Sequence, residues 1–352
     1  QQKLKIGVFG VWRGLAFIKA LQKIDEADVT AICDRDEGKV REALKFCPSD
    51  VKVCADFDEL IHSGIDAVVL GNYFDEHAPF AVRAMQAGVD VFSETTPAFT
   101  LKECVELVEA VEQTGRTYAL AENYPFYRAN REITRVYQTG VLGEVVFAEG
   151  EYVHPMSPAE YRYFTPAGRH WRNGLPTTYY CTHALSPLMS ATGLMPKRVI
   201  GKVSVSRGYA EELGKAPGSS CDNAGILLVE MDNNSAHAAL VRLGCQKGSI
   251  ENQRGSGELV RLCFNPWDMP KDGSFPSAES TYLPVESPLE EKAKGADHGG
   301  SDFFVTWNFI QDLLHHREPF MNVYRAVSIS AVGILGWRSA LDDSRQLDIP
   351  DF

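Results

Sequence analysis

In the first third of the chain, short hydrophobic runs rich in β-branched residues alternate with stretches whose hydrophobic residues recur at helical spacing. The runs predict strands over residues 5–10, 29–33, 66–71, 89–94 and 117–122. The stretches between them predict helices over 14–24 and from Glu37, His77 and Leu101. This alternation, with uniformly hydrophobic strands, predicts a parallel sheet with helices on both faces, which is a doubly wound α/β fold.

Beyond residue 142 the pattern changes to longer alternating runs, which are typical of antiparallel strands. These runs cover residues 144–154, 197–206, 224–243 and 248–264. Helices are expected near 183–192 and, at the end of the chain, over 302–315 and 323–341. The segment Pro266–Pro288 is too long for an ordinary connection and is either a functional or a mobile loop.

These patterns divide the chain into two predicted domains. Residues 1–124 form an N-terminal Rossmann domain with a doubly wound parallel sheet. Residues 125–352 form a C-terminal α+β domain with a large, mostly antiparallel open sheet. The C-terminal helices are expected to pack back toward the Rossmann domain.

Composition and charge narrow the range of functions. The 352 residues are 44% hydrophobic and 23% charged, which excludes disorder, collagen and coiled coil as classes. The net charge is −12, so neither nucleic acid nor an anionic membrane surface is an expected partner. The longest uncharged stretch near the C-terminus, Ala326–Trp337, is too short to span a membrane, and the N-terminus lacks the pattern of a secretory signal. We therefore expect a cytoplasmic protein.

The cysteine and histidine patterns do not predict a metal site. The eight cysteines are scattered without a C-x-x-C pair, which indicates reduced structural thiols. The adjacent His315 and His316 point in different directions on a helix, and a favourable charge at its C-terminus explains them better than a metal does.

The end of the first predicted strand is the expected position of a dinucleotide cofactor, because a helix begins there and its N–H groups and dipole favour a pyrophosphate. The residues expected to bind it are Gly10, Val11, Trp12 and Arg13. The glycine spacing is G-x-x-G-x-x-x-G instead of G-x-G-x-x-G, so a simple packing turn is the alternative.

A carboxylate after the second predicted strand favours NAD over NADP. Asp34 lies twenty residues after Gly14, where a carboxylate accepts hydrogen bonds from ribose hydroxyls and repels a 2′-phosphate. Arg35 beside it weakens the preference, because a guanidinium pairs well with that phosphate. The alternative interpretation of Asp34 is an N-cap of the helix that begins at Glu37.

Motifs along nearly the whole chain resemble those of the glucose-fructose oxidoreductase, inositol dehydrogenase and MocA-like (Gfo/Idh/MocA) family. They are Gly71-Asn72-Tyr73 with His77-Ala78, Ser93-Glu94-Thr95-Thr96-Pro97, Ala121-Glu122-Asn123-Tyr124, Thr182-His183, and Asp297-His298-Gly299-Gly300-Ser301-Asp302. The resemblance implies an NAD cofactor whose nicotinamide is lined by the loops after the later strands. The residues expected to contact it are Asn72, His77, Glu94, Thr95 and Asn123.

Two departures from the family pattern indicate a narrower resemblance. Most members carry a Glu-Lys-Pro triplet whose lysine polarises the reacting hydroxyl, whereas this chain has Glu94-Thr95-Thr96-Pro97. Many also have an aspartate four residues before the helix histidine, where this chain has Tyr179. In its motifs the chain is similar to the NAD-dependent α-N-acetylgalactosaminidases, which implies sugar binding by Tyr124, Tyr152, His154, Trp171, Arg172, Tyr179 and His298.

Within this resemblance, His183 is the candidate base for the hydroxyl proton that must leave during hydride transfer, because histidine titrates near neutral pH. Tyr180, one turn earlier, is a candidate second base, although a core tyrosine is an equal alternative. Two bases suggest redox-neutral glycoside cleavage by oxidation, elimination, hydration and reduction, an exception to the paired-carboxylate rule. The alternatives are a simple sugar or polyol dehydrogenase with net NADH formation, and a non-catalytic NAD-binding sensor.

The resemblance also implies an assembly. In this family the antiparallel sheet commonly pairs with that of another subunit, so we expect a homodimer or homotetramer formed through this sheet.

Overall fold

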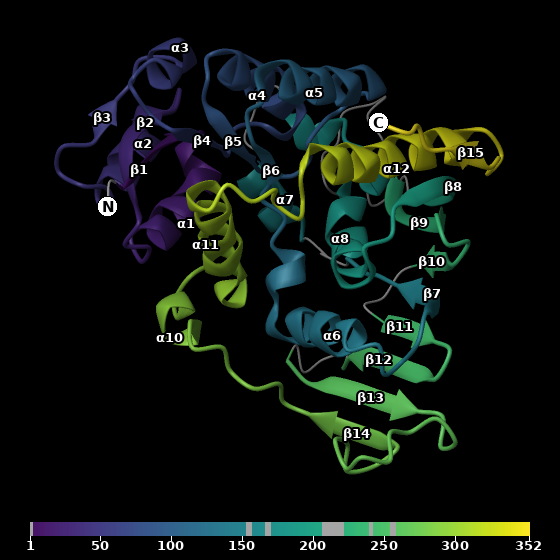
Figure 1. Ribbon diagram of the computed structural model, residues 1–352. Helices are drawn as coiled ribbons and strands as arrows, with labels where there is room; N and C mark the ends of the chain where they lie inside the picture. Colours follow the sequence, from purple (N-terminus) through teal and green to yellow (C-terminus); the bar gives the residue numbers. More distant parts are fainter. Residues whose placement is uncertain (1–2, 153–156, 166–169, 206–221, 239–241, 254–257) are drawn as a thin grey trace. The chain divides into compact units, whose positions relative to one another are not determined.

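The computed structural model describes residues 3–152, 157–165, 170–205, 222–238, 242–253 and 258–352. The chain divides into two compact units. The first unit comprises residues 1–128, 285–327 and 352, and the second comprises 129–284 and 328–351. Residues 285–327, which the sequence prediction placed in the second domain, thus belong to the first unit (Figure 1).

The first unit contains a six-stranded parallel sheet with the order β3-β2-β1-β4-β5-β6. The predicted doubly wound α/β fold is confirmed. A short edge strand, β3, was not predicted; its two residues are exposed and carry no hydrophobic periodicity. The strands are β1 (Leu4–Phe9), β2 (Ala27–Cys33), β3 (Lys52–Val53), β4 (Ala67–Leu70), β5 (Asp90–Ser93) and β6 (Tyr118–Leu120).

The helices of this unit begin where local capping signals allow. Helix α1 begins at Val11, earlier than predicted, because Gly10 adopts a left-handed conformation with φ +81° and turns the chain directly into the helix. Thr100 and Glu103 form a capping box at the start of α5. The helices are α1 (Val11–Leu21), α2 (Glu37–Leu44), α3 (Phe57–Ile61), α4 (His77–Gln86), α5 (Leu101–Thr114), α10 (Glu290–Ala293) and α11 (Ser301–Leu314).

Aromatic side chains join α11 to the parallel sheet. The ring of Phe92 on β5 stacks on Phe309 of α11 at 4.5 Å between centroids, and it meets Phe17 of α1 edge-on at 5.4 Å. Phe17 and Phe92 are almost completely buried. This packing of large rings explains why a segment so distant in sequence belongs to the first unit.

The second unit contains a nine-stranded sheet with the order β14-β13-β12-β11-β7-β10-β9-β8-β15. It is antiparallel except for the pair of β10 and β7, which confirms the predicted mostly antiparallel sheet. The strands are β7 (Val145–Glu149), β8 (Pro196–Val205), β9 (Asp222–Met231), β10 (Ala236–Ala238), β11 (Arg242–Cys245), β12 (Gly248–Asn252), β13 (Val260–Phe264), β14 (Glu279–Tyr282) and β15 (Leu347–Asp348).

Three helices pack against this sheet, and two further short helices precede α8 in the chain. Helix α12 lies so close to β8 that position 201 of the strand must be glycine. A Cβ on Gly201 would lie 2.0 Å from the carbonyl oxygen of Gly336 in α12. A strand, β14, lies in the Pro266–Pro288 segment. The three helices are α6 (Arg128–Gln138), α8 (Cys181–Thr192) and α12 (Val323–Leu341), which begins in the first unit; α7 (Pro158–Phe164) and the 3-10 helix η4 (Thr177–Tyr180) precede α8.

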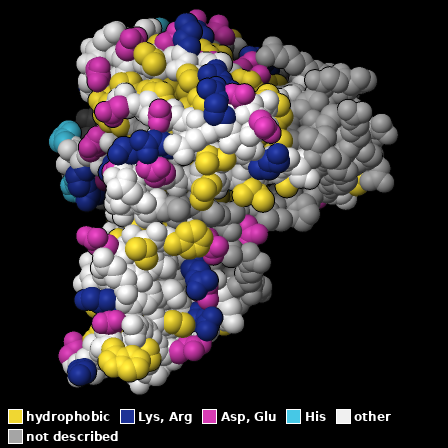
Figure 2. Space-filling view, turned by 90° about the vertical axis from the view of Figure 1, so that its right-hand side faces the viewer, with side chains coloured by type: hydrophobic (Ala, Val, Ile, Leu, Met, Phe, Trp, Pro, Cys, Tyr) yellow, Lys and Arg dark blue, Asp and Glu magenta, His cyan; other side chains and the backbone are white. Residues whose placement is uncertain are grey.

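On the face shown in Figure 2, hydrophobic side chains are interspersed with charged side chains of both signs. The described part of that face therefore has no extended patch of a single sign. None of the helices within the described ranges is long and apolar enough to cross a membrane.

Candidate active site

The β1–α1 turn packs tightly against the loop after β4. A Cβ on Gly10 would lie 2.4 Å from the backbone nitrogen of Asn72, so only glycine permits this approach. Strands β1 and β4 are neighbours in the sheet, and the strand order reverses between them. Crevices at such a reversal, at the carboxyl ends of the strands, are where doubly wound folds bind ligands.

Asp34 is part of this turn through its carboxylate. Its Oδ2 accepts a hydrogen bond of 2.7 Å from the backbone N–H of Val11, and its Oδ1 accepts one of 2.9 Å from the N–H of Asp36. The N-cap of α2 is Asp36, which accepts hydrogen bonds from Gly38 and Lys39, so the alternative that Asp34 caps this helix is wrong. Arg35 pairs with Glu76 at 3.5 Å.

Five residues from four segments of the first unit form what we call the charged cluster: Arg13, Glu94, Asn123, His298 and Asp302. The Arg13 guanidinium donates to Glu94 Oε1 at 2.5 Å and, with two nitrogens, to both Asp302 oxygens at 2.9 and 3.3 Å. Asn123 donates to Asp302 at 2.7 Å, and His298 Nδ1 lies 2.9 Å from Asp302. The Asp302 side chain is completely buried, and these three hydrogen-bond partners all belong to the first unit.

Each charge in this cluster stabilises the charged form of its oppositely charged neighbours. Burial alone would raise the pKa of Asp302, but Arg13 and His298 hold this pKa well below its usual range. Burial alone would lower the pKa of Arg13, but Glu94 and Asp302 raise it. The hydrogen bond to Asp302 raises the pKa of His298, against the effect of burial. The pair of Arg13 and Asp302 is therefore charged at neutral pH.

The remaining predicted cofactor residues of this unit organise its loops. Glu94 Oε2 accepts hydrogen bonds from the N–H of Thr95 at 2.8 Å and from its hydroxyl at 3.2 Å. His77 is buried, with Nδ1 2.8 Å from the carbonyl oxygen of Thr96, and burial lowers its pKa. This neutral ring braces the loops after β4 and β5. Trp12 is 42% exposed, and the Lys39 ammonium lies 5.4 Å from its ring centre.

Five side chains of the second unit form what we call the aromatic cluster: Tyr152, Trp171, Arg172, Tyr180 and His183. The Tyr152 ring stacks on Tyr180 at 5.4 Å and lies 4.6 Å from His183, while Tyr180 and His183 are 5.8 Å apart, all between centroids. The Arg172 guanidinium carbon lies 4.3 Å from the Trp171 ring centre and 5.9 Å from that of Tyr180. Both predicted bases are thus in contact with the same aromatic ring.

Close backbone packing places these side chains together. A Cβ on Gly150, just after β7, would lie 1.8 Å from the carbonyl oxygen of Ala184 in α8, so the chain leading to Tyr152 passes directly beside the helix of His183. The hydroxyl of Thr178 in η4 donates to the carbonyl of Gly333 in α12 at 2.9 Å. Tyr180 is the last residue of η4 and the N-cap of α8, so it precedes the helix on which it was expected.

The other predicted sugar-binding residues have different positions. His298 and Tyr124 belong to the first unit, where the Tyr124 ring meets Tyr127 at 5.1 Å. The Cα of Tyr179, in η4, packs against Gly333 of α12. His154 lies outside the described residues.

Sequence reasoning missed the central role of Asp302. The signal was present, because His298 and Asp302 are four residues apart, a spacing that brings side chains together at a helix start. It also missed His170, whose Nδ1 accepts the N–H of Arg172 at 3.3 Å and whose ring stacks on Trp171. Within the described ranges, no group of three or more His, Cys, Asp and Glu residues could hold a metal ion.

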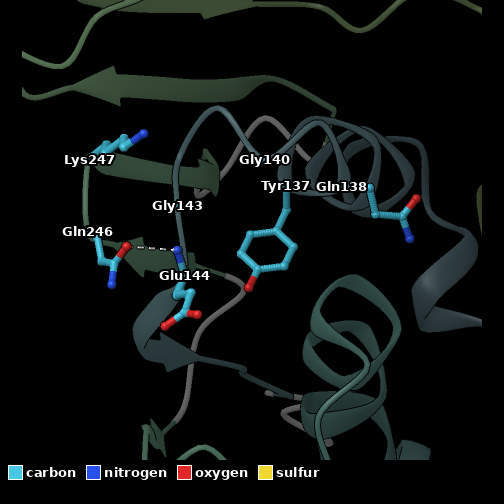
Figure 3. A pocket seen from close by; sticks show the side chains of 7 residues that line it. All are labelled: Tyr137, Gln138, Gly140, Gly143, Glu144, Gln246 and Lys247. Carbon is cyan, nitrogen blue, oxygen red and sulfur yellow. Dashed lines mark hydrogen bonds between the residues drawn. The ribbon is translucent and has the colours of Figure 1, made fainter.

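A surface cavity of about 510 Å³ lies elsewhere in the second unit (Figure 3). It is formed where α6 leads into β7, and the Gln246 side chain accepts the N–H of Glu144 there at 3.3 Å. It shares no residue with either cluster. The lining residues are Tyr137, Gln138, Gly140, Gly143, Glu144, Gln246 and Lys247.

The residues at the edge of the parallel sheet fit a dinucleotide. The amide nitrogen and oxygen of Asn72 are buried, and neither has a hydrogen-bond partner within the described part of the chain. Each carboxylate oxygen of Asp34 accepts one N–H and keeps capacity for a second hydrogen bond, as ribose hydroxyls require.

Comparison with known families agrees with this geometry. Residues 4–122 match the model of the Gfo/Idh/MocA family, described as an oxidoreductase family with an NAD-binding Rossmann fold. Residues 281–352 match the model of the glycosyl hydrolase 109 C-terminal domain. The second match contains the segment of His298 and Asp302. The resemblance stated from the motifs is confirmed.

Comparisons over the whole chain also find glycosyl hydrolase 109 proteins among the similar sequences. The chain is similar to an α-N-acetylgalactosaminidase of Tannerella forsythia, with 26% identity over 92% of this chain and 80% of that protein. It is similar to a glycosyl hydrolase family 109 protein of Shewanella pealeana, with 23% identity over 99% of this chain and 85% of that protein. Among solved structures, levoglucosan dehydrogenase in complex with NADH and L-sorbose has a TM-score of 0.82 at 16% identity, covering all of both chains, and shows a shared fold.

Proposed function

Because this chain carries the NAD-binding domain of the Gfo/Idh/MocA oxidoreductase family, we propose that it uses NAD to transfer hydride to and from a sugar ring carbon, as part of redox-neutral cleavage of a glycoside. Two features support the glycoside as substrate: the similarity to an α-N-acetylgalactosaminidase over most of the chain, and a second candidate base, the Tyr180 hydroxyl, on a ring beside His183.

NAD, when bound, supplies a hydride acceptor that becomes a hydride donor later in the cycle. In this chain Asp34 would hold the adenosine ribose, and the N-terminus of α1 with Gly10 would hold the pyrophosphate. Asn72, whose side-chain amide has no hydrogen-bond partner among the described residues, would line the nicotinamide half together with Glu94, Thr95 and Asn123. Arg13 contributes by holding Glu94 and Asp302 in place instead of by direct charge on the cofactor.

The two predicted bases would take different protons. In oxidation, the proton of the sugar hydroxyl passes to His183 while hydride leaves the same carbon, which becomes a ketone. The ketone acidifies the neighbouring C–H, and Tyr180 takes this proton as the glycosidic bond breaks and its electrons leave with the aglycone oxygen. The Arg172 guanidinium carbon lies 5.9 Å from the centre of the Tyr180 ring, so a cation is present beside this candidate base.

Water completes the cycle. Its oxygen adds to the carbon that lost the aglycone, Tyr180 returns the proton that it took to the neighbouring carbon, and the proton that water releases balances the charge of the aglycone oxygen. Hydride then returns to the ketone carbon while His183 gives back its proton. The atoms and electrons balance as hydrolysis, and no NADH accumulates. This distinguishes the proposed reaction from a simple dehydrogenase.

The observation that carries the proposal is the contact of Tyr180 and His183 with the same Tyr152 ring, 5.4 and 4.6 Å between centroids. The test is incubation of the purified chain with NAD and a panel of nitrophenyl α- and β-glycosides, with nitrophenol and NADH absorbance recorded in one cuvette. Nitrophenol release without NADH accumulation is expected.

Tyr180→Phe tests the division of roles, because it keeps the ring but removes the hydroxyl. We expect nitrophenol release to fall about 100-fold, while a small amount of NADH forms on mixing because oxidation still proceeds. Tyr163→Phe, at a 71% exposed tyrosine of the same unit, is the matched control and should have wild-type activity. NADH accumulation by the unmodified chain on intact glycosides would support the dehydrogenase alternative instead.

For the assembly, we propose that two copies pair through the outer face of the nine-stranded sheet. Strand pairing places Phe147, Ile226 and Leu228 on one face, and these side chains are 39%, 65% and 45% exposed. Beside them runs a row of ion pairs that joins Arg242, Glu251, Arg261 and Glu279. Sedimentation of the wild type and of Ile226→Lys tests this: a dimer or larger assembly should dissociate in the variant.

A further inference from the structure

Two side chains of the charged cluster have a polar atom that is not used within it: Asn123, whose Oδ1 is buried, and His298, whose ring is partly exposed. Asp302 is enclosed by Arg13, Asn123 and His298, and Glu94 accepts from Arg13 and Thr95. The His298 side chain, in contrast, is 45% exposed. Its Nδ1 faces the Asp302 carboxylate, which only accepts hydrogen bonds, so Nδ1 carries a proton and Nε2 points away from the pair.

The backbone holds this histidine in an uncommon conformation. His298 has φ +53°, and Gly299 and Gly300 follow with φ +62° and +90° before α11 begins. A non-glycine residue rarely adopts this region, and such a conformation persists where surrounding contacts determine it. Here the contacts are the hydrogen bond between Nδ1 and Asp302 and the one that the Ser301 hydroxyl donates to the carbonyl oxygen of His298 at 2.8 Å.

The cluster lies at the edge where the cofactor is proposed to bind. Arg13 belongs to the first turn of α1 after β1, Glu94 follows β5 and Asn123 follows β6, so all three come from the carboxyl ends of parallel strands. Asp302 contacts Arg13 and Asn123 directly, which places His298 beside the same edge.

A dinucleotide brings two phosphate charges to this edge, and Arg13 does not neutralise them, because its guanidinium is paired with two carboxylates. We infer that His298 is a cofactor-binding residue, which as an imidazolium donates its Nε2–H to the dinucleotide while Asp302 holds its orientation. This inference rests on the proposed function. It assigns His298 to the cofactor and not to the sugar, as the motif resemblance had implied.

The groups that face His298 favour its protonated form at neutral pH. They are Asp302 on its own segment, which raises its pKa, Arg13 from α1, which lowers it, and Glu94 after β5, which raises it. Burial raises the pKa of the neighbouring Tyr127, which therefore stays uncharged. Cofactor affinity should thus weaken as pH rises and His298 loses its proton.

The test is NADH binding to the full chain, followed by NADH fluorescence at about pH 6 and about pH 8.5. We expect the wild type to bind more weakly at the higher pH. His298→Asn, which suits the left-handed backbone, should bind about ten-fold more weakly at about pH 6 and lose the pH dependence. His316→Gln, at an exposed histidine of the same unit, is the matched control and should behave as wild type.

Asp302→Asn adds a second measurement, the pH at which NADH affinity is lost. This pH would not change if His298 had only a structural role. The substitution removes the charge that raises the pKa of His298, so the loss of affinity should shift to lower pH. If this variant does not fold, His298→Asn still decides the matter. Wild-type affinity and pH dependence in a folded His298→Asn overturn the inference alone, whereas no NADH binding by the unmodified chain overturns the proposed function together with it.

Discussion

The charged cluster of the first unit and the aromatic cluster of the second differ in how they are held. Arg13 and Asn123 are fixed by short hydrogen bonds to the carboxylate of Asp302, which is completely buried. Tyr152, Tyr180 and His183 are arranged by ring packing and by close backbone approach at Gly150. A buried charge left without its partner destabilises the fold, whereas a ring can lose its polar atom and still pack. Changes in the charged cluster should therefore reduce stability, and changes in the aromatic cluster should reduce activity.

The largest effect is expected at His183. His183→Ala should reduce nitrophenol release from the responsive glycoside about 1,000-fold, because it removes the base for the hydroxyl proton. NADH affinity should not change, since the cofactor residues lie in the first unit. Steady-state kinetics and NADH titration check this. Full turnover by the variant would show that His183 is not the base, and a chain that binds NADH but never turns over any glycoside or sugar would match the sensor alternative.

Arg13→Leu examines the other side of the comparison. It leaves Asp302 buried without its cation, so the free energy of unfolding should fall by about 3 kcal/mol. Urea unfolding monitored by circular dichroism gives this value. Arg35→Leu removes an ion pair in which the arginine is 74% exposed, and it should cost less than about 1 kcal/mol. Equal costs for the two variants would contradict the structural role given to the charged cluster.

A change at Asp34 should have a smaller effect, on cofactor choice. Asp34→Ser removes the carboxylate that repels a 2′-phosphate, so the ratio of NAD to NADP affinity should fall about ten-fold in calorimetry. The pairing of Arg35 with Glu76 reduces the help that this guanidinium gives to NADP in the wild type. NADP binding to the wild type as tightly as NAD would refute the role of Asp34.

The smallest effect is the pH dependence of stability that comes from His298. The pKa of His298 is raised in the folded chain. Protonated His298 therefore contributes fully to the stability of the fold below the ordinary pKa of histidine, and this contribution disappears as the pH rises through the pKa of the folded chain. From about pH 6 to about pH 8.5, the free energy of unfolding should fall further in the wild type than in His298→Asn. The difference between the two should be less than about 1 kcal/mol, because the ring is partly exposed. Urea unfolding at both pH values measures the difference, and a wild type that gains stability relative to the variant would contradict the assigned direction.

Local patterns were sufficient for much of the fold. Uniformly hydrophobic strands separated by amphipathic stretches predicted the parallel sheet, and alternating runs predicted the antiparallel one. The last helix has the bounds that periodicity predicted, Val323–Leu341. These features depend on residues that are close in sequence, because period and capping are set within one or two turns. The start of α1 was missed because the left-handed conformation of Gly10 depends on its contact with Asn72.

The sequence by itself also determined the chemistry available: a dinucleotide turn with Asp34 after the second strand, and a histidine three residues after a tyrosine at a helix start. Only the tertiary structure decided which groups meet. Arg13 and Asp302 are 289 positions apart, and 285–327 joins the first unit because its phenylalanines pack on the parallel sheet. Tyr152 reaches His183 because Gly150 lets two backbones touch. These contacts bury charges and rings that are far apart in the sequence. Contacts of this kind leave no periodic signal in the chain, so the sequence does not predict them.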